Sequence, residues 1–193
     1  MSNKVRYNLK NLHYAKIKET EGVVSYEPPV KWPGAVSLDM SASGELAEFY
    51  ADGIKYYVTS ANNGYSGTLE VALIPDDFRK DILGEKEDPT GKFIYEDANA
   101  KPAQFALLFE FDGNEKEIRH VLYGVTPTRP NISGNTNTAT RDVATESISI
   151  EASPVIFNGI PVVKAKTQES TTEEAFAAWY AAVPIPTIET SEV

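Results

Sequence analysis

Alternation of apolar and polar residues between Ala103 and Phe157 constrains the fold more than any other feature of this sequence. The segment AQFALLFEF reaches a turn at Asp112-Gly113-Asn114-Glu115 and returns as KEIRHVLYGV. A polar run, residues 126–146, precedes a second alternating segment, SISIEASPVIF. The period of two and the turn residues predict a β-hairpin followed by a third strand. The polar run is either a plain solvated loop or a segment that contacts something else.

The same alternation predicts further strands in the first 75 residues. Residues 5–18 read as one long strand or two short ones, and residues 36–41 and 68–74 as one strand each. LAEFY and IKYYV flank Ala51-Asp52-Gly53, where Asp-Gly predicts a second tight hairpin. We therefore expect a mainly β protein, an antiparallel β-sandwich or barrel, with residues 1–193 in a single domain and 184–193 as a mobile tail.

Two helices are expected at the periphery. Residues 76–83 combine Asp76 as a candidate cap, an apolar pair four residues apart, and Gly84 for a left-handed exit. This helix is expected to plug one end of a sheet. Residues 171–183 begin with a possible capping box, carry apolar residues at helical spacing and stop at Pro184, which predicts an amphipathic helix of about three turns.

Composition narrows the possible functions. The chain has 193 residues and a formal net charge of −10, with no basic cluster, which argues against tight binding to nucleic acid. It contains no cysteine, so disulfides and thiolate metal sites are excluded and assembly in a cytoplasm is mildly favoured. No segment approaches the apolar length of a membrane span, and the N-terminal residues do not resemble a signal peptide, so membrane insertion is not expected.

Motifs for catalysis or cofactor binding are not found in the sequence. The two histidines, His13 and His120, lack metal-ligand spacing, and no phosphate-binding glycine loop or nucleophile elbow occurs. We expect no enzyme activity, cofactor or metal; a hydrolase is a remote alternative. A carbohydrate- or surface-binding module is a second alternative, because aromatic residues are frequent in turn-rich sequence: Trp32, Tyr50, Tyr56, Tyr57 and Tyr65.

Three segments together resemble the major tail proteins, or tail tube proteins, of long-tailed bacteriophages, in particular the phi13-type family. They are LAEFYADGIKYYVTSANNGYSGTLEVALIPDDFRKDILG at 46–84, PAQFALLFEFDGNEKEIRHVLYGVTPTRP at 102–130 and TATRDVATESISIEASPVIF at 138–157. None is a catalytic motif; their order along the chain carries the resemblance. The appended immunoglobulin-like domain of some such proteins has no counterpart in this sequence.

The resemblance implies a subunit that closes with five copies of itself into a hexameric ring, and rings that stack into a tube for DNA. It implies a virion location, assembly in the host cytoplasm, and contacts with tape-measure, tail terminator and distal tail proteins. Six chains of charge −10 give −60 per ring (6 × −10), which would repel phosphates from the wall. A tube subunit of a phage-derived injection particle, such as a tailocin, is the alternative within the same fold.

The resemblance also suggests where such a subunit makes its contacts. A long hairpin reaches the next ring in such tubes, and residues 41–57 match it best, with the N-terminal arm and residues 126–146 as further candidates. The lumen would be lined by carboxylates on strand faces, although the outer surface is an equal alternative for them. The inter-ring candidates are Ser41, Glu45, Phe49, Tyr50, Asp52, Gly53 and Tyr57; the lumen candidates are Glu110, Glu117 and Glu151.

Overall fold

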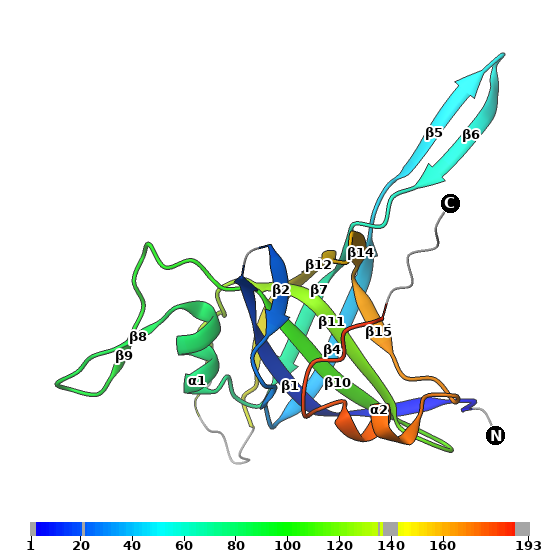
Figure 1. Cartoon of the computed structure of the whole chain (residues 1–193). Helices are drawn as coiled ribbons and strands as arrows, with labels where there is room; N and C mark the ends of the chain where they lie inside the picture. The colour runs from blue at the N-terminus through cyan, green and yellow to red at the C-terminus, as the bar shows by residue number, and fades with distance from the viewer. Residues whose placement is uncertain (1–2, 21, 135, 137–142, 188–193) are drawn as a thin grey trace.

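A computed structural model describes residues 3–20, 22–134, 136 and 143–187 of the chain (Figure 1). Antiparallel strands dominate it, so the predicted mainly β fold class is confirmed. One large sheet has the strand order β2-β1-β10-β11-β12-β7-β4, with β3 added beside β1 and β15 beside β11. Its strands are β1 (Arg6–Thr20), β2 (Val23–Tyr26), β3 (Val30–Lys31), β4 (Ala35–Ser43), β7 (Gly64–Val71), β10 (Phe105–Gly113), β11 (Ile118–Pro127), β12 (Glu146–Ser153) and β15 (Lys164–Lys166).

The large sheet curls on itself. Strand β1 crosses the molecule and comes close to β4, the last strand of the order, without a hydrogen-bonded ladder between them (Figure 1). Strand β1 is one long strand, as one reading of the sequence allowed. Its ladder with β10 is interrupted twice, where Asn8 and Asn11 adopt left-handed φ values of 53° and 51°. The extra residues at such irregularities bend a strand, which suits a curled sheet.

Strand β10 is the centre of the fold because both of its faces are buried. Phe105, Leu107 and Phe109 point into the inner core, whereas Ala106 and Leu108 point to the opposite face. The hairpin of β10 and β11 confirms the one predicted from the sequence. Burial on both faces explains why FALLF reads as a continuous apolar run rather than a strict alternation.

The inner core lies within the curled sheet and is closed at one end by the predicted helix. This helix consists of α1 (Asp76–Phe78) and a π-helical turn, η1 (Arg79–Leu83). Phe78 lies fully buried against Tyr14, Trp32 and Phe105, with ring centroids 4.3 to 5.3 Å apart. Gly84 takes the expected left-handed conformation after η1. The expectation of a side-chain cap from Asp76 is wrong, because Pro75 occupies the N-cap position and makes no side-chain hydrogen bond.

The C-terminal segment covers the other face of β10 and β11. Helix α2 (Glu173–Ala178) has the Thr172 hydroxyl as its N-cap, accepting from the Ala175 amide. The regular helix ends before Trp179, so the expected three turns are reduced to a short helix and a following turn. Trp179 and Val183 nevertheless pack on the sheet as the amphipathic pattern predicted. The Tyr123 hydroxyl of β11 donates to the Pro184 carbonyl at 2.7 Å, so the first residue of the expected tail is bound to the sheet. Residues 188–193 of that tail lie outside the described residues.

Three small hairpins complete the described structure. Strand β13 (Val155–Phe157) pairs with β14 (Ile160–Val162), and this hairpin packs on the same face of β10 and β11 as the C-terminal segment. Strand β8 (Lys86–Glu87) pairs with β9 (Ile94–Tyr95) in a charged loop. The third, β5 (Leu46–Ala51) with β6 (Ile54–Ser60), confirms the hairpin predicted around Asp52-Gly53. Figure 1 shows it projecting from the end of β4, away from the rest of the ribbon. Among the described residues, no helix is long and apolar enough to cross a membrane.

Candidate assembly surfaces

A polar face covers the outer side of strands β4, β7 and β12. The ladder places its residues in three cross-strand rows, and each row contains one carboxylate among hydroxyl side chains. The inward side of the same strands carries Leu38, Leu69 and Ile148, so the alternation separates the core from this face cleanly. The rows are Ser37–Glu70–Ser147, Asp39–Thr68–Ser149 and Ser41–Ser66–Glu151.

None of the nine side chains of this polar face is cationic. Glu70 accepts hydrogen bonds from the hydroxyls of Thr145 and Ser37, and these hold its pKa below the usual value. The carboxylate therefore stays ionised at neutral pH. Short side chains and negative charge give a surface that repels polyanions.

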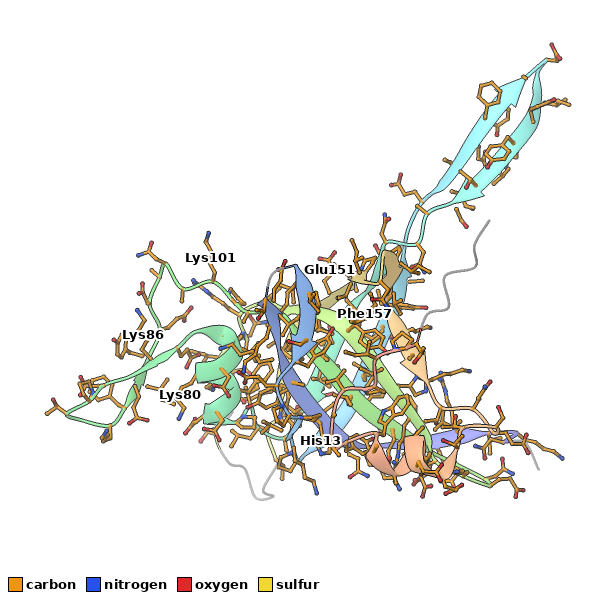
Figure 2. The ribbon with its side chains drawn as sticks, in the orientation of Figure 1. His13, Lys80, Lys86, Lys101, Glu151 and Phe157 are labelled. Carbon is orange, nitrogen blue, oxygen red and sulfur yellow. The ribbon has the colours of Figure 1, made fainter. Side chains whose placement is uncertain are left out.

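Glu151 is the one lumen candidate that lies on the polar face, exposed on β12 (Figure 2). Glu117 precedes β11 and lines a shallow groove with Lys116 and Lys166, away from this face. Asp39 and Glu70 were not among the lumen candidates, although the alternation of Ser37, Asp39 and Ser41 was visible in the sequence. The missing information was which strands lie side by side, and that comes only from the sheet order.

Glu110 is wrong as a lumen candidate because its side chain is only 2% exposed. The carboxylate lies under the C-terminal segment, where it accepts from Arg119 Nε at 3.0 Å and from the Tyr180 hydroxyl at 3.1 Å. Asn11 Nδ2 donates to its second oxygen at 2.6 Å. Arg119 also donates to the Phe176 carbonyl and lies 3.7 Å from the centre of that ring. Glu110 and Arg119 thus connect the C-terminal segment to the sheet.

The β5–β6 hairpin is the second candidate surface. Its ladder pairs Phe49 with Tyr57 and Ala51 with Ile54, which places these side chains on one face. On the other face Glu48 accepts from Lys55 and from the Tyr50 hydroxyl. One face of the hairpin is therefore apolar, and the other holds a charged cluster.

No other element of the described structure packs extensively against the hairpin, and all seven of its large apolar side chains are exposed. An isolated two-stranded hairpin is only marginally stable in water, and monomers rarely leave so much apolar surface uncovered. The exposure is a reason to expect a partner. The side chains are Leu46, Phe49, Tyr50, Ile54, Tyr56, Tyr57 and Val58.

Two glycines form the root of the hairpin. Gly44 and Gly64 have φ values of 154° and 102°, and a Cβ atom on either would lie within 2 Å of a backbone carbonyl oxygen. Only glycine fits such positions. Ser43 and Gly64 pair directly, so the hairpin leaves the sheet abruptly at this point.

Most of the predicted inter-ring residues lie on this hairpin or its root: Glu45, Phe49, Tyr50, Asp52, Gly53 and Tyr57. Ser41 belongs instead to β4 and the polar face. The polar run 126–146 joins the neighbouring strands β11 and β12, and its residues 135 and 137–142 lie outside the described residues. Its proposed contact role stays a prediction.

The aromatic residues that suggested carbohydrate binding do not form a common platform. Trp32 is 1% exposed and packs between Tyr14 and Phe78. Tyr65 packs against the inner core, whereas Tyr50, Tyr56 and Tyr57 lie on the projecting hairpin. A flat stack of exposed rings from these five residues is therefore excluded.

The two histidines lie in different environments. His120 stacks on Phe109 with centroids 5.2 Å apart, and its buried Nε2 has no hydrogen-bond partner among the described residues. Burial and the nearby cations Arg6, Lys166 and Lys164 lower its pKa to about 4. His13 stacks on Tyr180. No group of three or more potential metal ligands occurs among the described residues.

No protein-family model matches the sequence, and no curated protein matches it significantly. A chain of the anti-feeding prophage baseplate aligns over 89% of this chain and 99% of its own length, with 7% identity and a TM-score of 0.48. A chain of the extended sheath-tube complex of PVC, an extracellular contractile injection system, aligns over 86% and 93%, with 12% identity and a TM-score of 0.45. The tube-terminating cap of the anti-feeding prophage aligns over 85% and 93%, with 12% identity and a TM-score of 0.44.

Proposed function

We propose that this protein is the subunit of a bacteriophage tail tube, in which hexameric rings stack to form a conduit for DNA. The polar face of β4, β7 and β12 carries the proposal. A wall past which DNA must slide needs negative charge, short side chains and no cation that would hold a phosphate. The rows of hydroxyls and carboxylates have these properties, and they belong to an antiparallel sheet whose last strand, β4, has an edge that a neighbouring copy can extend.

The charge of this face sets the potential in the conduit. Asp39, Glu70 and Glu151 contribute three carboxylates per chain, so a ring of six chains has 3 × 6 = 18 of them around the lumen. Within a narrow lumen the phosphates lie within about one Debye length of the wall, roughly 8 Å at physiological salt, so screening is incomplete. DNA is then kept from adhering to the wall during ejection.

The second part of the proposal is that the β5–β6 hairpin connects successive rings. Its exposed apolar residues need cover that the isolated subunit does not supply. Strand β4 also has a free edge in the isolated subunit, since it pairs only with β7 among the described strands. Free edges and an uncovered hairpin are liabilities in a monomer, but closed rings in a stack cover both.

Negative-stain electron microscopy of the concentrated protein tests the assembly. We expect rings or tubes for the full chain. Deleting residues 45–62 leaves Gly44-Asn63 as a two-residue turn between the paired residues Ser43 and Gly64, so the shortened subunit is expected to fold. It is expected to form single rings without stacking; tubes of unchanged length from this variant would contradict the role of the hairpin.

The lumen assignment is tested by reversing its charge. In a triple variant with Asp39→Lys, Glu70→Lys and Glu151→Lys, assembled tubes should retain DNA that nuclease cannot reach. The matched control carries Glu19→Lys, Asp76→Lys and Glu174→Lys at exposed positions outside the polar face. DNA bound to the control should be digested. Equal nuclease protection in both variants would show that the polar face does not line the lumen.

A further inference from the structure

We propose that the apolar face of the β5–β6 hairpin docks on a second copy of this chain, at the groove between β1 and the β3–β4 connection. This rests on the proposed function and names the surface that receives the hairpin. The groove has a volume of about 280 Å³ and lies beside the short β1–β3 ladder, where the chain passes from β3 to the start of β4. Leu9, Lys10 and Asn11 of β1 line one side, and Lys31, Pro33, Gly34 and Ala35 line the other. Leu12 and Trp32 lie buried beneath the groove, where the Trp32 amide donates to the Leu12 carbonyl at 2.8 Å.

The position of the groove suits stacking of copies in one direction. Strand β4 begins at Ala35, in the groove, and ends at Ser43, where the chain enters the hairpin. Its nine residues span roughly 30 Å at about 3.3 Å per residue, so the hairpin and the groove lie at opposite ends of one strand. Figure 1 shows the hairpin continuing beyond the end of β4. A contact between opposite ends of identical subunits repeats without closing, as a stack requires.

Exposed apolar side chains flank the groove, and the hairpin face that docks there is also apolar. Val36 and Leu73 are 49% and 65% exposed there. Their segments lie side by side, because Trp32 Nε1 donates to the Leu73 carbonyl and the Ala72 amide donates to the Gly34 carbonyl. Phe49, Ile54 and Tyr57 on the hairpin are the matching apolar side chains.

Charge supports the same pairing. Lys31 lines the groove, is exposed, and forms no ion pair among the described residues. The hairpin segment contains three carboxylates, Glu45, Glu48 and Asp52, against one lysine, Lys55, which is already paired with Glu48. An acidic hairpin tip and an uncompensated lysine attract each other, and such pairs set orientation more than affinity.

Disulfide cross-linking tests the contact directly, because the chain contains no cysteine of its own. The test variant carries Ala51→Cys near the hairpin tip and Leu73→Cys beside the groove. The control carries Ala51→Cys and Ile156→Cys; Ile156 is 64% exposed, against 65% for Leu73, but lies on β13. After oxidation of assembled tubes, we expect a ladder of covalent multimers from the test variant alone.

The outcomes separate the docking proposal from the proposed function. Tubes without a covalent ladder, or with equal ladders from both variants, would overturn the docking site while leaving the tube intact. Failure of the full chain to form rings or tubes would overturn both. Cross-linking within one chain would migrate as a monomer and is distinguished on a denaturing gel.

A second measurement uses the charge of the groove. Lys31→Glu is expected to raise the critical concentration for tube formation about tenfold, since repulsion of about 1.4 kcal/mol corresponds to that factor. Lys101→Glu reverses an equally exposed lysine on the loop that follows β9 (Figure 2), and should change it less than about twofold. Equal effects of the two substitutions would contradict a specific contact at Lys31.

Discussion

The hairpins β5–β6 and β10–β11 are built from the same local signals and end in opposite environments. Each has aromatic and aliphatic residues in both of its strands, and each carries an Asp-Gly pair at its turn region. Strand β10 is buried on both faces, whereas β5 and β6 are exposed on both. The difference shows that the local sequence specifies that a hairpin forms, but not whether another part of the molecule packs against it. One hairpin forms the centre of the subunit, and the other stays exposed.

The largest expected effect is loss of the centre. Phe105→Ala removes a fully buried ring that contacts Phe78 and should destabilise the isolated subunit by about 4 kcal/mol. Urea denaturation of the monomer measures this. Phe93→Ala, at a 60% exposed ring, is the control and should change stability by less than about 0.5 kcal/mol. Similar values for the two would mean that β10 is not the core strand.

The next effect concerns the C-terminal segment that covers β10. Arg119→Met leaves the Glu110 carboxylate buried without its main cation, which should cost about 3 kcal/mol. Lys18→Met breaks an exposed pair with Glu27 and should cost less than about 1 kcal/mol. Urea denaturation followed by far-ultraviolet circular dichroism measures both losses. An Arg119 variant as stable as the Lys18 variant would contradict the connecting role of Glu110.

A pH effect of similar or smaller size is expected from His120. Its pKa is about 4 in the folded chain against 6.5 in the unfolded one, so the unfolded chain takes up the proton first as the pH falls. This contribution is complete above about pH 6.5 and is lost progressively toward pH 4, by at most about 3 kcal/mol. The difference in stability between the native protein and His120→Phe, measured from pH 7 to pH 4, isolates it. A difference that is constant with pH would contradict the folded-state pKa.

The smallest effect on stability, and the sharpest test of the comparison, is on the exposed hairpin. Phe49→Ser with Tyr57→Ser should change the stability of the monomer by less than about 0.5 kcal/mol, because both rings are exposed. Stacking into tubes, seen by electron microscopy, should nevertheless be lost. The same kind of change at two exposed rings of the β8–β9 hairpin, Phe93→Ser with Tyr95→Ser, should leave tubes intact. Loss of monomer stability in the first variant would show that the hairpin is packed within its own subunit.

Much of the fold could be predicted from the sequence because its signals are local. Alternation located β1, β4, β7, β10, β11 and β12, and Asp52-Gly53 located the tight turn of β5–β6. The helix after Pro75 and its exit at Gly84 followed from turn chemistry. The second helix was overestimated, because the apolar spacing continues into a turn, through Trp179 and Val183, that packs without remaining helical.

The candidate surfaces were predicted less completely, for a physical reason. Glu110 alternates with apolar neighbours just as Glu151 does, and spacing alone cannot tell a covered face from an open one. A segment 66 residues further along the chain, beginning at Phe176, covers Glu110: the Tyr180 hydroxyl donates to its carboxylate, and the Phe176 carbonyl accepts from Arg119. Asp39 and Glu70 needed the sheet order before they became neighbours of the strand that carries Glu151.

By itself, the sequence determined the strands, the tight turns, the acidic charge and the absence of cysteine, because each depends on residues close in the chain or on composition. Only the tertiary structure decided which faces are covered. Sheet order joined β4, β7 and β12 into one polar face and placed Glu110 beneath the C-terminal segment. The β5–β6 hairpin stays exposed, because no other described element packs extensively against it. Burial depends on contacts between distant segments, and local periodicity does not encode them.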